Sequence, residues 1–416
     1  MLFTRLIFES LRFAWNELLV NPLRTILSLL GVTIGIFAII GVFTIVDSLE
    51  SSIKTSLSFL GDKVIYVMKW PWVFNGPYPW WKYMKRPQAS YNEFRYLEAN
   101  LRNRTGITIF ADRSRVIAKY KSSSKGDIEL YGVSYGYSTV METPIEKGRY
   151  FSLDEVEMGR NVAILGTNIS EGLFGTKDPI GNEISIRGLK FIVIGVMNKQ
   201  GKNLIDAPSN DDYCLIPYGE FIKLYYSGIK GGVESVIAVK GYDNDVGLVK
   251  LESEMRGMMR SVRGLRPREE DNFALNRPES IANAIGSVFN VLGIAGWVIG
   301  SFSILVGGFG IANIMFVSVK ERTHIIGIQK SMGAKNYFVL FQFLFEAIFL
   351  SVIGGAAGLM MVFGITFLPT GTLHLALSVQ NIVLGIGVSS IIGMVAGIVP
   401  AAVAARLDPV IAIRSN

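Results

Sequence analysis

The chain has 416 residues, of which 50% are hydrophobic and 18% are charged, and its mean hydropathy is +0.37, values typical of a membrane protein. A single cysteine, Cys214, excludes an internal disulfide framework. The net charge of +7 lies largely beside apolar segments, where it indicates membrane orientation and gives no support to a nucleic-acid partner.

The first 21 residues are predicted to form an amphipathic interfacial helix. Phe3, Ile7, Leu11 and Leu18 recur at helical spacing, and polar residues fall on the opposite side. Such a helix places its apolar face against lipid or against the membrane spans. Contact with a cytoplasmic partner is the alternative.

The first apolar segment continues beyond the membrane edge. Val46, Leu49, Ile53 and Leu57 extend a helical stripe as far as Gly61, a residue suited to ending a helix. A helix over residues 22–60 would be roughly 58 Å long at about 1.5 Å per residue, against about 30 Å of hydrocarbon. Residues 281–319 give the same excess length, so the sequence predicts two helices that form a stalk able to transmit motion.

The region between these helices, 61–280, is predicted to be an extracytoplasmic α+β domain. Strand and helix patterns give a β-α-β arrangement at each of its ends, which predicts one subdomain built from both ends. A mainly β subdomain, about 106–219, is inserted into it. The predicted fold class is therefore an α-helical membrane protein with four transmembrane helices and a large α+β extracytoplasmic domain.

An aromatic loop, WPWVFNGPYPWWKYMKRP, occupies residues 70–87 and contains Trp70, Trp72, Trp80 and Trp81. Clustered aromatic and proline residues form a rigid surface for a partner. They also form self-packed loops or rest on lipid headgroups. These alternatives stay open at the level of sequence.

Three further spans follow, and the charged residues beside them set the orientation. The predicted boundaries are a second span at 281–319, a connection at 320–335, a third span at 336–368, an external loop at 369–378, a fourth span at 379–405 and a tail at 406–416. Basic residues lie in the N-terminal segment, in 320–335 and in the tail, whereas 369–378 has none. Both termini and the 320–335 connection are therefore expected in the cytoplasm.

The spans are rich in small residues and hold one carboxylate. G-x-x-x-G spacings, which let helix backbones approach closely, occur once in each span; they are Gly31 and Gly35, Gly296 and Gly300, Gly354 and Gly358, and Gly393 and Gly397. They predict tight packing, within the chain or between copies. Glu346 in the third span is either a functional group or a helix–helix hydrogen bond near the inner headgroups.

The sequence gives little support for an enzyme. Its two histidines, His324 and His374, are predicted on opposite sides of the membrane, so no histidine-based metal cluster or Ser-His-Asp arrangement is expected. Residues 195–203 approach a phosphate-binding loop, but their glycine spacing is one residue too long and Asn203 replaces the magnesium-binding hydroxyl. No catalytic or metal-binding residue and no cofactor is predicted for this chain.

Four stretches together resemble a known family. They are LRFAWNELLVNPLRTILSLLGVTIGI, then GRYFSLDEVEMGRNVAILGTNISEGLFGTKDPIGNEISIRGLKFIVIGVMNKQG, then VKERTHIIGIQKSMGAKNYFVLFQFLFEAIFLSVIGGAAG, and finally GIVPAAVAARLDPVIAIR. The chain is similar to permeases of the MacB/FtsX-like superfamily, ABC-type systems that include the lipoprotein-releasing pair LolC and LolE. The third stretch resembles the block ERTxEIGIRKAxGA, although His324-Ile325 replaces the usual pair that ends in glutamate. The chain begins with the membrane part, without the ATPase that the macrolide exporter carries.

The resemblance implies that 320–335 is a coupling helix that docks on a cytoplasmic ABC ATPase subunit. Ile325, Ile328 and Met332 share one face at helical spacing, and Gly333 is placed to end the helix. The residues expected to serve coupling are Glu321, Arg322, Ile325, Gly327, Ile328, Lys330, Gly333 and Ala334. The external β-α-β subdomain would correspond to a porter-like one.

The implied mechanism is mechanotransmission in a bacterial inner membrane. A homodimer or related heterodimer would use ATP and Mg²⁺ bound by its ATPase partner to move the periplasmic domain, and so export or release a hydrophobic or envelope substrate. A periplasmic adaptor is a further expected partner. The alternative is a signalling scaffold like FtsX, which regulates cell-wall hydrolases without transport.

Overall fold

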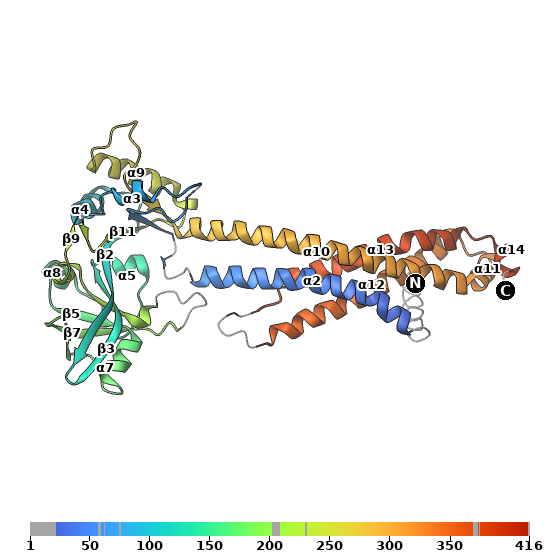
Figure 1. The fold of residues 1–416 in the computed structure, drawn as a ribbon, viewed down its shortest axis with the longest axis horizontal. Helices are drawn as coiled ribbons and strands as arrows, with labels where there is room; N and C mark the ends of the chain where they lie inside the picture. The colour runs from blue at the N-terminus through green and yellow to red at the C-terminus, as the bar shows by residue number, and fades with distance from the viewer. Residues whose placement is uncertain are drawn as a thin grey trace. The chain divides into compact units, whose positions relative to one another are not determined.

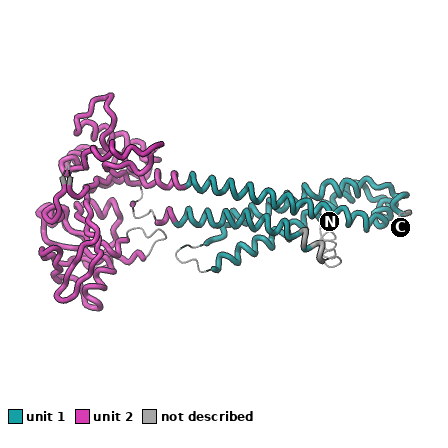
Figure 2. Tube along the Cα trace, in the orientation of Figure 1, with its two compact units in different colours: residues 1–52, 286–416 teal, residues 53–285 magenta. Residues whose placement is uncertain are grey.

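A computed structural model describes residues 22–56, 60–61, 63–74, 76–201, 209–228, 231–368, 373 and 375–414. The predicted helix at 1–21, part of the first stalk and part of the 369–378 loop lie outside these residues. The chain divides into a helical unit, Met1–Ser52 with Gly286–Asn416, and a globular unit, Ile53–Ile285 (Figure 2).

Four long helices are apolar enough to cross a membrane, as the sequence predicted. They are α2 (Pro22–Ser56), α10 (Pro278–Glu321), α12 (Asn336–Thr366) and α13 (Val379–Arg406). The 44 residues of α10 give a length of about 66 Å at about 1.5 Å per residue. This helix starts three residues earlier than predicted because Pro278 suits a first helical turn.

The G-x-x-x-G glycines of the helical unit lie at contacts between helices of the same chain. A Cβ on Gly31 of α2 would lie 2.7 Å from Gly307 Cα of α10. On α12, a Cβ at Gly358 would lie 2.7 Å from the Thr33 carbonyl oxygen. A Cβ would lie within 2.8 Å of a neighbour at Gly296, Gly300, Gly393 and Gly397, and 3.2 Å and 3.4 Å from one at Gly35 and Gly354. The sequence left packing within the chain or between copies open, and these contacts are within the chain.

The ends of the globular unit come together as one antiparallel arrangement of strands. β1 (Val64–Met68), β2 (Gly106–Tyr120), β11 (Ser235–Lys240) and β12 (Ala274–Asn276) lie in the order β12-β1-β11-β2. The helix α4 (Tyr91–Asn100) links β1 to β2, and α9 (Val249–Val262) lies between β11 and β12 in the chain. Each helix thus joins two strands separated by a third, a ferredoxin-like pattern of split β-α-β units (Figure 1). These strands and helices lie where the sequence placed a β-α-β pattern at each end.

The rest of the globular unit extends this sheet. Beyond β2 the order continues as β3-β8-β5-β7-β4, with β6 pairing β2 and β7, which gives ten strands. The bounds are β3 (Ser123–Val133), β4 (Ile145–Gly148), β5 (Val162–Leu165), β6 (Glu183–Ile186), β7 (Leu189–Met197) and β8 (Tyr213–Pro217), with the small pair β9 (Ser227–Gly228) and β10 (Gly231–Gly232). The shorter helices are α3 (Trp80–Met84), α5 (Tyr137–Met141), α6 (Leu153–Glu157), α7 (Thr167–Phe174) and α8 (Tyr218–Leu224).

The sequence predicted two subdomains with a boundary near residue 106, but the structure joins both groups of strands through β2. This strand pairs with β11 over Gly106–Ala111 and with β3 from Phe110 to Tyr120, so the sheet continues across the expected boundary. One core contains residues from both groups, including Ile109, Leu130 and Ile237. The pairing of β2 with β11 joins residues that are far apart in the sequence. A local sequence pattern does not reveal such pairing, so the sequence predicted a boundary where the sheet in fact continues.

Candidate functional site

The connection between α10 and α12 folds as a short helix with defined ends. α11 (Thr323–Ser331) starts after Arg322, whose φ of −100° and ψ of 9° interrupt α10. Its end is a Schellman motif, in which Gly333 N–H donates to Lys330 O at 3.0 Å and Ala334 N–H donates to Gln329 O at 3.0 Å. Gly333 has a φ of +100°, which favours glycine. The glycine predicted to end this helix does so.

A second short helix, α14 (Pro409–Arg414), packs against α11 (Figure 1). A Cβ on Gly327 would lie 2.9 Å from Ala412 Cβ, so only a very small residue fits there. His324 Nδ1 lies 3.3 Å from Ile413 O. Sequence reasoning missed α14, although Asp408-Pro409 is a recognisable helix start and Asp408 Oδ1 accepts from Val410 N–H at 2.8 Å.

Lys330 ties α11 to the end of α13. Its Nζ donates to Ala405 O at 3.0 Å and to Leu407 O at 2.6 Å. The last carbonyls of a helix have no partner within the helix, and a cation there also interacts favourably with the helix dipole. The Lys330 ammonium therefore fixes α11 to the C-terminal end of α13.

The α11–α14 pair leaves apolar side chains exposed. Ile325 is 53% exposed, Ile328 40% and Met332 77%, whereas Ile326 is buried. On α14, Val410 and Ile411 are also exposed. We call these five residues the connector face. Exposed apolar side chains on an ordered helix pair are typical of a contact with another protein or with the membrane.

The predicted coupling residues divide into two groups. Glu321, Ile325, Ile328 and Gly333 are exposed, Arg322, Lys330 and Ala334 are half-buried, and Gly327 is buried. The inward-facing residues hold α11 in place, and the outward-facing ones remain accessible. Their role in docking an ATPase stays a prediction.

Arg322 forms an ion pair with Glu346. Arg322 Nη1 lies 3.3 Å from Glu346 Oε2, and the Glu346 side chain is 1% exposed. The sequence suggested no charged partner for Glu346 within the spans, because Arg322 lies at the α10–α11 junction, 24 positions away. The pair connects the start of α11 to α12, and removing one member of such a buried pair is costly.

A pocket of about 400 Å³ lies beside the connector face. It is lined by Thr323, Val403, Arg406, Leu407, Asp408, Ile411 and Ala412. These residues come from α11, α13, α14 and the two-residue link between α13 and α14, so the pocket depends on the contact between α11 and α14. An apolar side chain of a docked protein would fit it.

The aromatic loop of the globular unit is partly packed and partly exposed. Trp72 lies 5.0 Å from Tyr66 between ring centroids, and Trp70 lies 6.3 Å from Tyr83. Trp80 and Trp81 are 53% and 59% exposed on α3. The first two tryptophans support the self-packed alternative, and the second two remain accessible to a partner.

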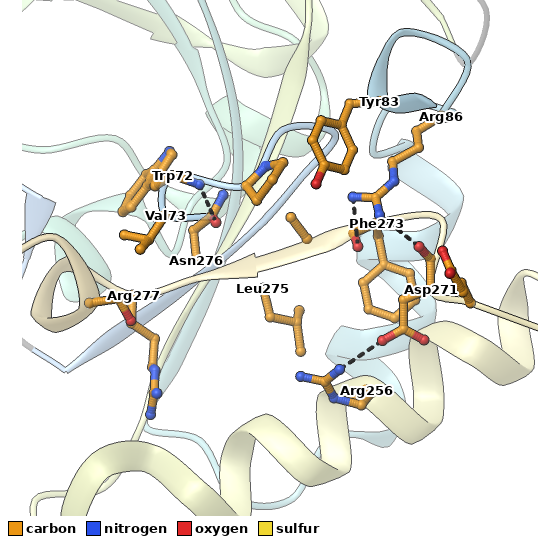
Figure 3. Close-up of a pocket in the computed structure, with 14 residues that line it drawn as sticks. Trp72, Val73, Tyr83, Arg86, Arg256, Asp271, Phe273, Leu275, Asn276 and Arg277 are labelled. Atoms are coloured by element: carbon orange, nitrogen blue, oxygen red, sulfur yellow. Dashed lines mark hydrogen bonds and ion pairs between the residues drawn. The ribbon is translucent and has the colours of Figure 1, made fainter. Parts of the chain in front are cut away.

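Beside this loop lies a pocket of about 330 Å³ whose lining mixes aromatic and charged groups (Figure 3). Arg86 Nη1 donates to Phe273 O at 3.2 Å, and its Nη2 donates to Asp271 O at 2.9 Å. Burial lowers the pKa of the Arg86 guanidinium, while Tyr83 and the carboxylates of Asp271 and Glu270 oppose that change.

Comparison with known families gives two matches. Residues 25–256 match the model of the MacB-like periplasmic core domain, and residues 297–409 match that of the FtsX-like permease C-terminal. Together these models cover most of the globular unit and the region that contains α11, and they end at the first residue of α14.

Three curated relatives are 28% or 29% identical to the chain over the aligned residues. A macrolide export ATP-binding/permease protein MacB of Wolinella succinogenes is 28% identical over 99% of this chain and 61% of its own length. A pyoverdine export ATP-binding/permease protein PvdT of Pseudomonas syringae is 28% identical over 99% of this chain and 60% of its own length. The ABC transporter permease YknZ of Bacillus subtilis is 29% identical over 98% of both chains. The chain thus spans about 60% of the length of the first two relatives.

Among solved structures, the periplasmic region of MacB from Actinobacillus actinomycetemcomitans matches 55% of this chain and 95% of its own. The sequence identity is 18% and the TM-score 0.43.

Proposed function

The chain belongs to the family of MacB/FtsX-type ABC permeases, and from that premise we propose that it transmits the work of a separate ATPase to its globular unit. In this proposal a cytoplasmic ABC ATPase binds ATP and Mg²⁺ and docks on the connector face. The globular unit lies in the periplasm of a bacterium with the helices in the inner membrane and both termini in the cytoplasm. Movement of the globular unit exports or releases a hydrophobic or envelope substrate such as a drug, peptide, lipid or lipoprotein.

The observation that carries the proposal is the construction of α11. Its two ends are fixed by the Arg322–Glu346 pair and the Schellman motif, and its side is fixed by Lys330 and α14. Ile325 and Ile328 nevertheless face outward. A rigid helix with an exposed apolar stripe suits helix-in-groove docking, and a rigid attachment passes force to the spans with little loss.

A single long helix, α10, joins the residue before α11 to the globular unit. α10 runs from Pro278 to Glu321, so it begins within the globular unit and ends directly before α11. The second long helix, α2, also reaches the globular unit. Movement of α11 would therefore pass along α10, and a second copy of the permease, identical or related, would complete the transporter.

The test is a double variant of the connector face, Ile325→Asp with Ile328→Asp. Burying two unpaired carboxylates in an ATPase groove costs several kcal/mol each, and about 1.4 kcal/mol is already tenfold in affinity. The variant is expected to insert and fold but to lose its ATPase during co-purification. The proposal fails if the double variant retains the ATPase at wild-type strength.

Two controls accompany this test. Val246→Asp with Val249→Asp makes the same kind of change, at the same spacing, at residues of the globular unit that are 88% and 62% exposed. Lys335→Ala removes an exposed charge near α11, and exposed charges contribute little. Both control proteins are expected to keep the ATPase. A deletion strain then separates export from signalling, because altered drug or lipoprotein handling supports export and a cell-chaining defect does not.

A further inference from the structure

β12 has an unpaired edge. It pairs with β1 on one side through Met68 and Ala274, Val67 and Leu275, and Tyr66 and Asn276. Among the residues that the structure describes, no strand pairs with its other side, and β12 stands first in the sheet order. The N–H and C=O groups along such an edge form a template for a strand from another chain.

The free edge lies in the pocket of about 330 Å³, which we call the edge groove (Figure 3). The aromatic loop contributes Trp72 and Tyr83 to its lining, α9 contributes Arg256, and β12 contributes Leu275. Ligand clefts span about 300–1,000 Å³, so this volume suits the side chains of a short segment.

Side chains hold both ends of β12 against the aromatic loop. Asn276 Nδ2 donates to Trp70 O at 2.7 Å, and Asn276 Oδ1 accepts from Trp72 N–H at 3.0 Å. At the other end, Arg86 donates to Phe273 O at 3.2 Å. The groove is therefore formed before any ligand arrives, which lowers the entropic cost of binding.

The segments that form the groove carry a net positive charge, although the lining holds Glu270 and Asp271 beside Arg86, Arg256 and Arg277. Residues 69–87 carry four basic side chains and no acidic one, and residues 249–277 carry seven basic and five acidic ones. The two segments together have a net charge of +6, against +7 for the whole chain. Such a field attracts an acidic partner and repels a basic one.

We propose that the edge groove binds an acidic, extended peptide segment of another protein, which adds as a strand to β12. Main-chain hydrogen bonds to β12 supply affinity, and alternate side chains supply specificity. Arg256 already pairs with Glu252 at 2.8 Å and with Asp271 at 2.7 Å, so a carboxylate of the segment shares or replaces one of these partners. The apolar side chains of the segment contact Trp72 and Tyr83. The bound strand lies next to the start of α10, because Pro278 follows β12 after one residue. This proposal does not depend on the coupling role of α11.

The experiment uses the full chain in nanodiscs of zwitterionic lipid and a fluorescein-labelled peptide of roughly eight residues, a common strand length, that alternates Glu and Val. Binding is followed by fluorescence anisotropy. Three matched probes serve as comparisons. One replaces Glu by Lys, and the other two N-methylate every second backbone nitrogen, one in each register. The acidic probe is expected to bind saturably. The Lys probe, and the N-methylated probe whose methyl groups face β12, are expected to bind at least about tenfold more weakly, a difference of about 1.4 kcal/mol.

A substitution of Arg256 tests whether the probe binds in the edge groove. Arg256→Glu is expected to weaken the acidic probe at least about tenfold. The change also removes the pairs of Arg256 with Glu252 and Asp271, so a thermal melt of the variant checks that the globular unit stays folded. Arg95→Glu, an equal change at an exposed α4 side chain outside the groove, is expected to leave binding unchanged. The proposal is overturned if the acidic probe fails to bind, if N-methylation has no effect in either register, or if both arginine variants behave alike. A further control adds phosphatidylglycerol vesicles. The proposal is also overturned if these vesicles displace the probe and bind the protein equally with and without Arg256→Glu, because the basic residues around the groove would then bind lipid.

Discussion

The contacts of α2 in the helical unit and the sheet core of the globular unit differ in the residues that meet there. Where α2 meets α10 and α12, the closest contacts involve glycines, and a Cβ on Gly31 would lie 2.7 Å from the backbone of Gly307. The core of the globular unit is instead filled by large side chains, including Phe191, Phe221 and Leu130, which are fully buried. Lipid tails are as apolar as leucine, so helices in a membrane gain from close backbone approach, whereas a domain in water gains from burying apolar area.

This difference teaches that the two units should respond oppositely to a change in side-chain size. Enlarging a residue should damage the helical unit, and truncating one should damage the globular unit. The ion pair between Arg322 and Glu346 adds a third kind of contact to the helical unit. Four predictions test these statements, from the largest expected effect to the smallest.

Gly358→Leu tests the glycine contacts. The Thr33 carbonyl oxygen, 2.7 Å from the position of the new Cβ, belongs to a helix backbone and cannot move aside, so α2 and α12 must separate. We expect the yield of monodisperse protein in detergent, measured by size-exclusion chromatography, to collapse. Gly364→Leu is the matched control on α12, since nothing lies within 4 Å of its Cβ position. Equal yields of the two variants would show that close glycine contacts do not hold the helical unit together.

Arg322→Leu tests the ion pair. Removing one partner of a buried pair costs about 3–5 kcal/mol, whereas replacing both by apolar residues is often neutral. We expect Arg322→Leu to lower the thermal stability of the purified protein, and Arg322→Leu with Glu346→Leu to recover much of the loss. A double variant as unstable as the sum of the single variants would show that the two side chains are not coupled.

Ile109→Ala tests the globular core. Ile109 is fully buried in β2, and truncating such a residue costs about 2–5 kcal/mol. The unfolding transition seen by tryptophan fluorescence is expected to shift to lower denaturant concentration. Ile117→Ala, on the same strand but 54% exposed, should shift it by no more than about 0.5 kcal/mol. A large shift at Ile117 would contradict the assignment of the two faces of β2.

Trp80→Ala with Trp81→Ala sharpens the comparison within the aromatic loop. Both side chains are more than half exposed, so the expected change in stability is within about 0.5 kcal/mol per residue, and assembly should stay intact. Trp72→Ala should destabilise the globular unit more, because that ring packs on Tyr66. Loss of folding in the double variant would establish instead that the whole loop is self-packed.

Local sequence patterns were sufficient to predict much of the architecture. Runs of apolar residues predicted the four spans, Gly333 predicted the end of α11, and strand and helix periodicity predicted the β-α-β pattern at each end of the globular unit. The outward apolar positions of α11, Ile325 and Ile328, followed from helical spacing alone. These features depend on residues within a few positions of each other, where dihedral preferences and amphipathic spacing act.

Tertiary structure decided the features that join distant parts of the sequence. No local pattern links Arg322 to Glu346, Gly327 to Ala412, or β2 to β11 across more than a hundred residues. The same holds for the edge groove, whose walls come from residues 71–86 and 256–280. Sequence periodicity specifies which face of an element is apolar, but it does not specify which partner covers that face. That choice depends on side-chain volumes and hydrogen bonds that only the folded chain brings together.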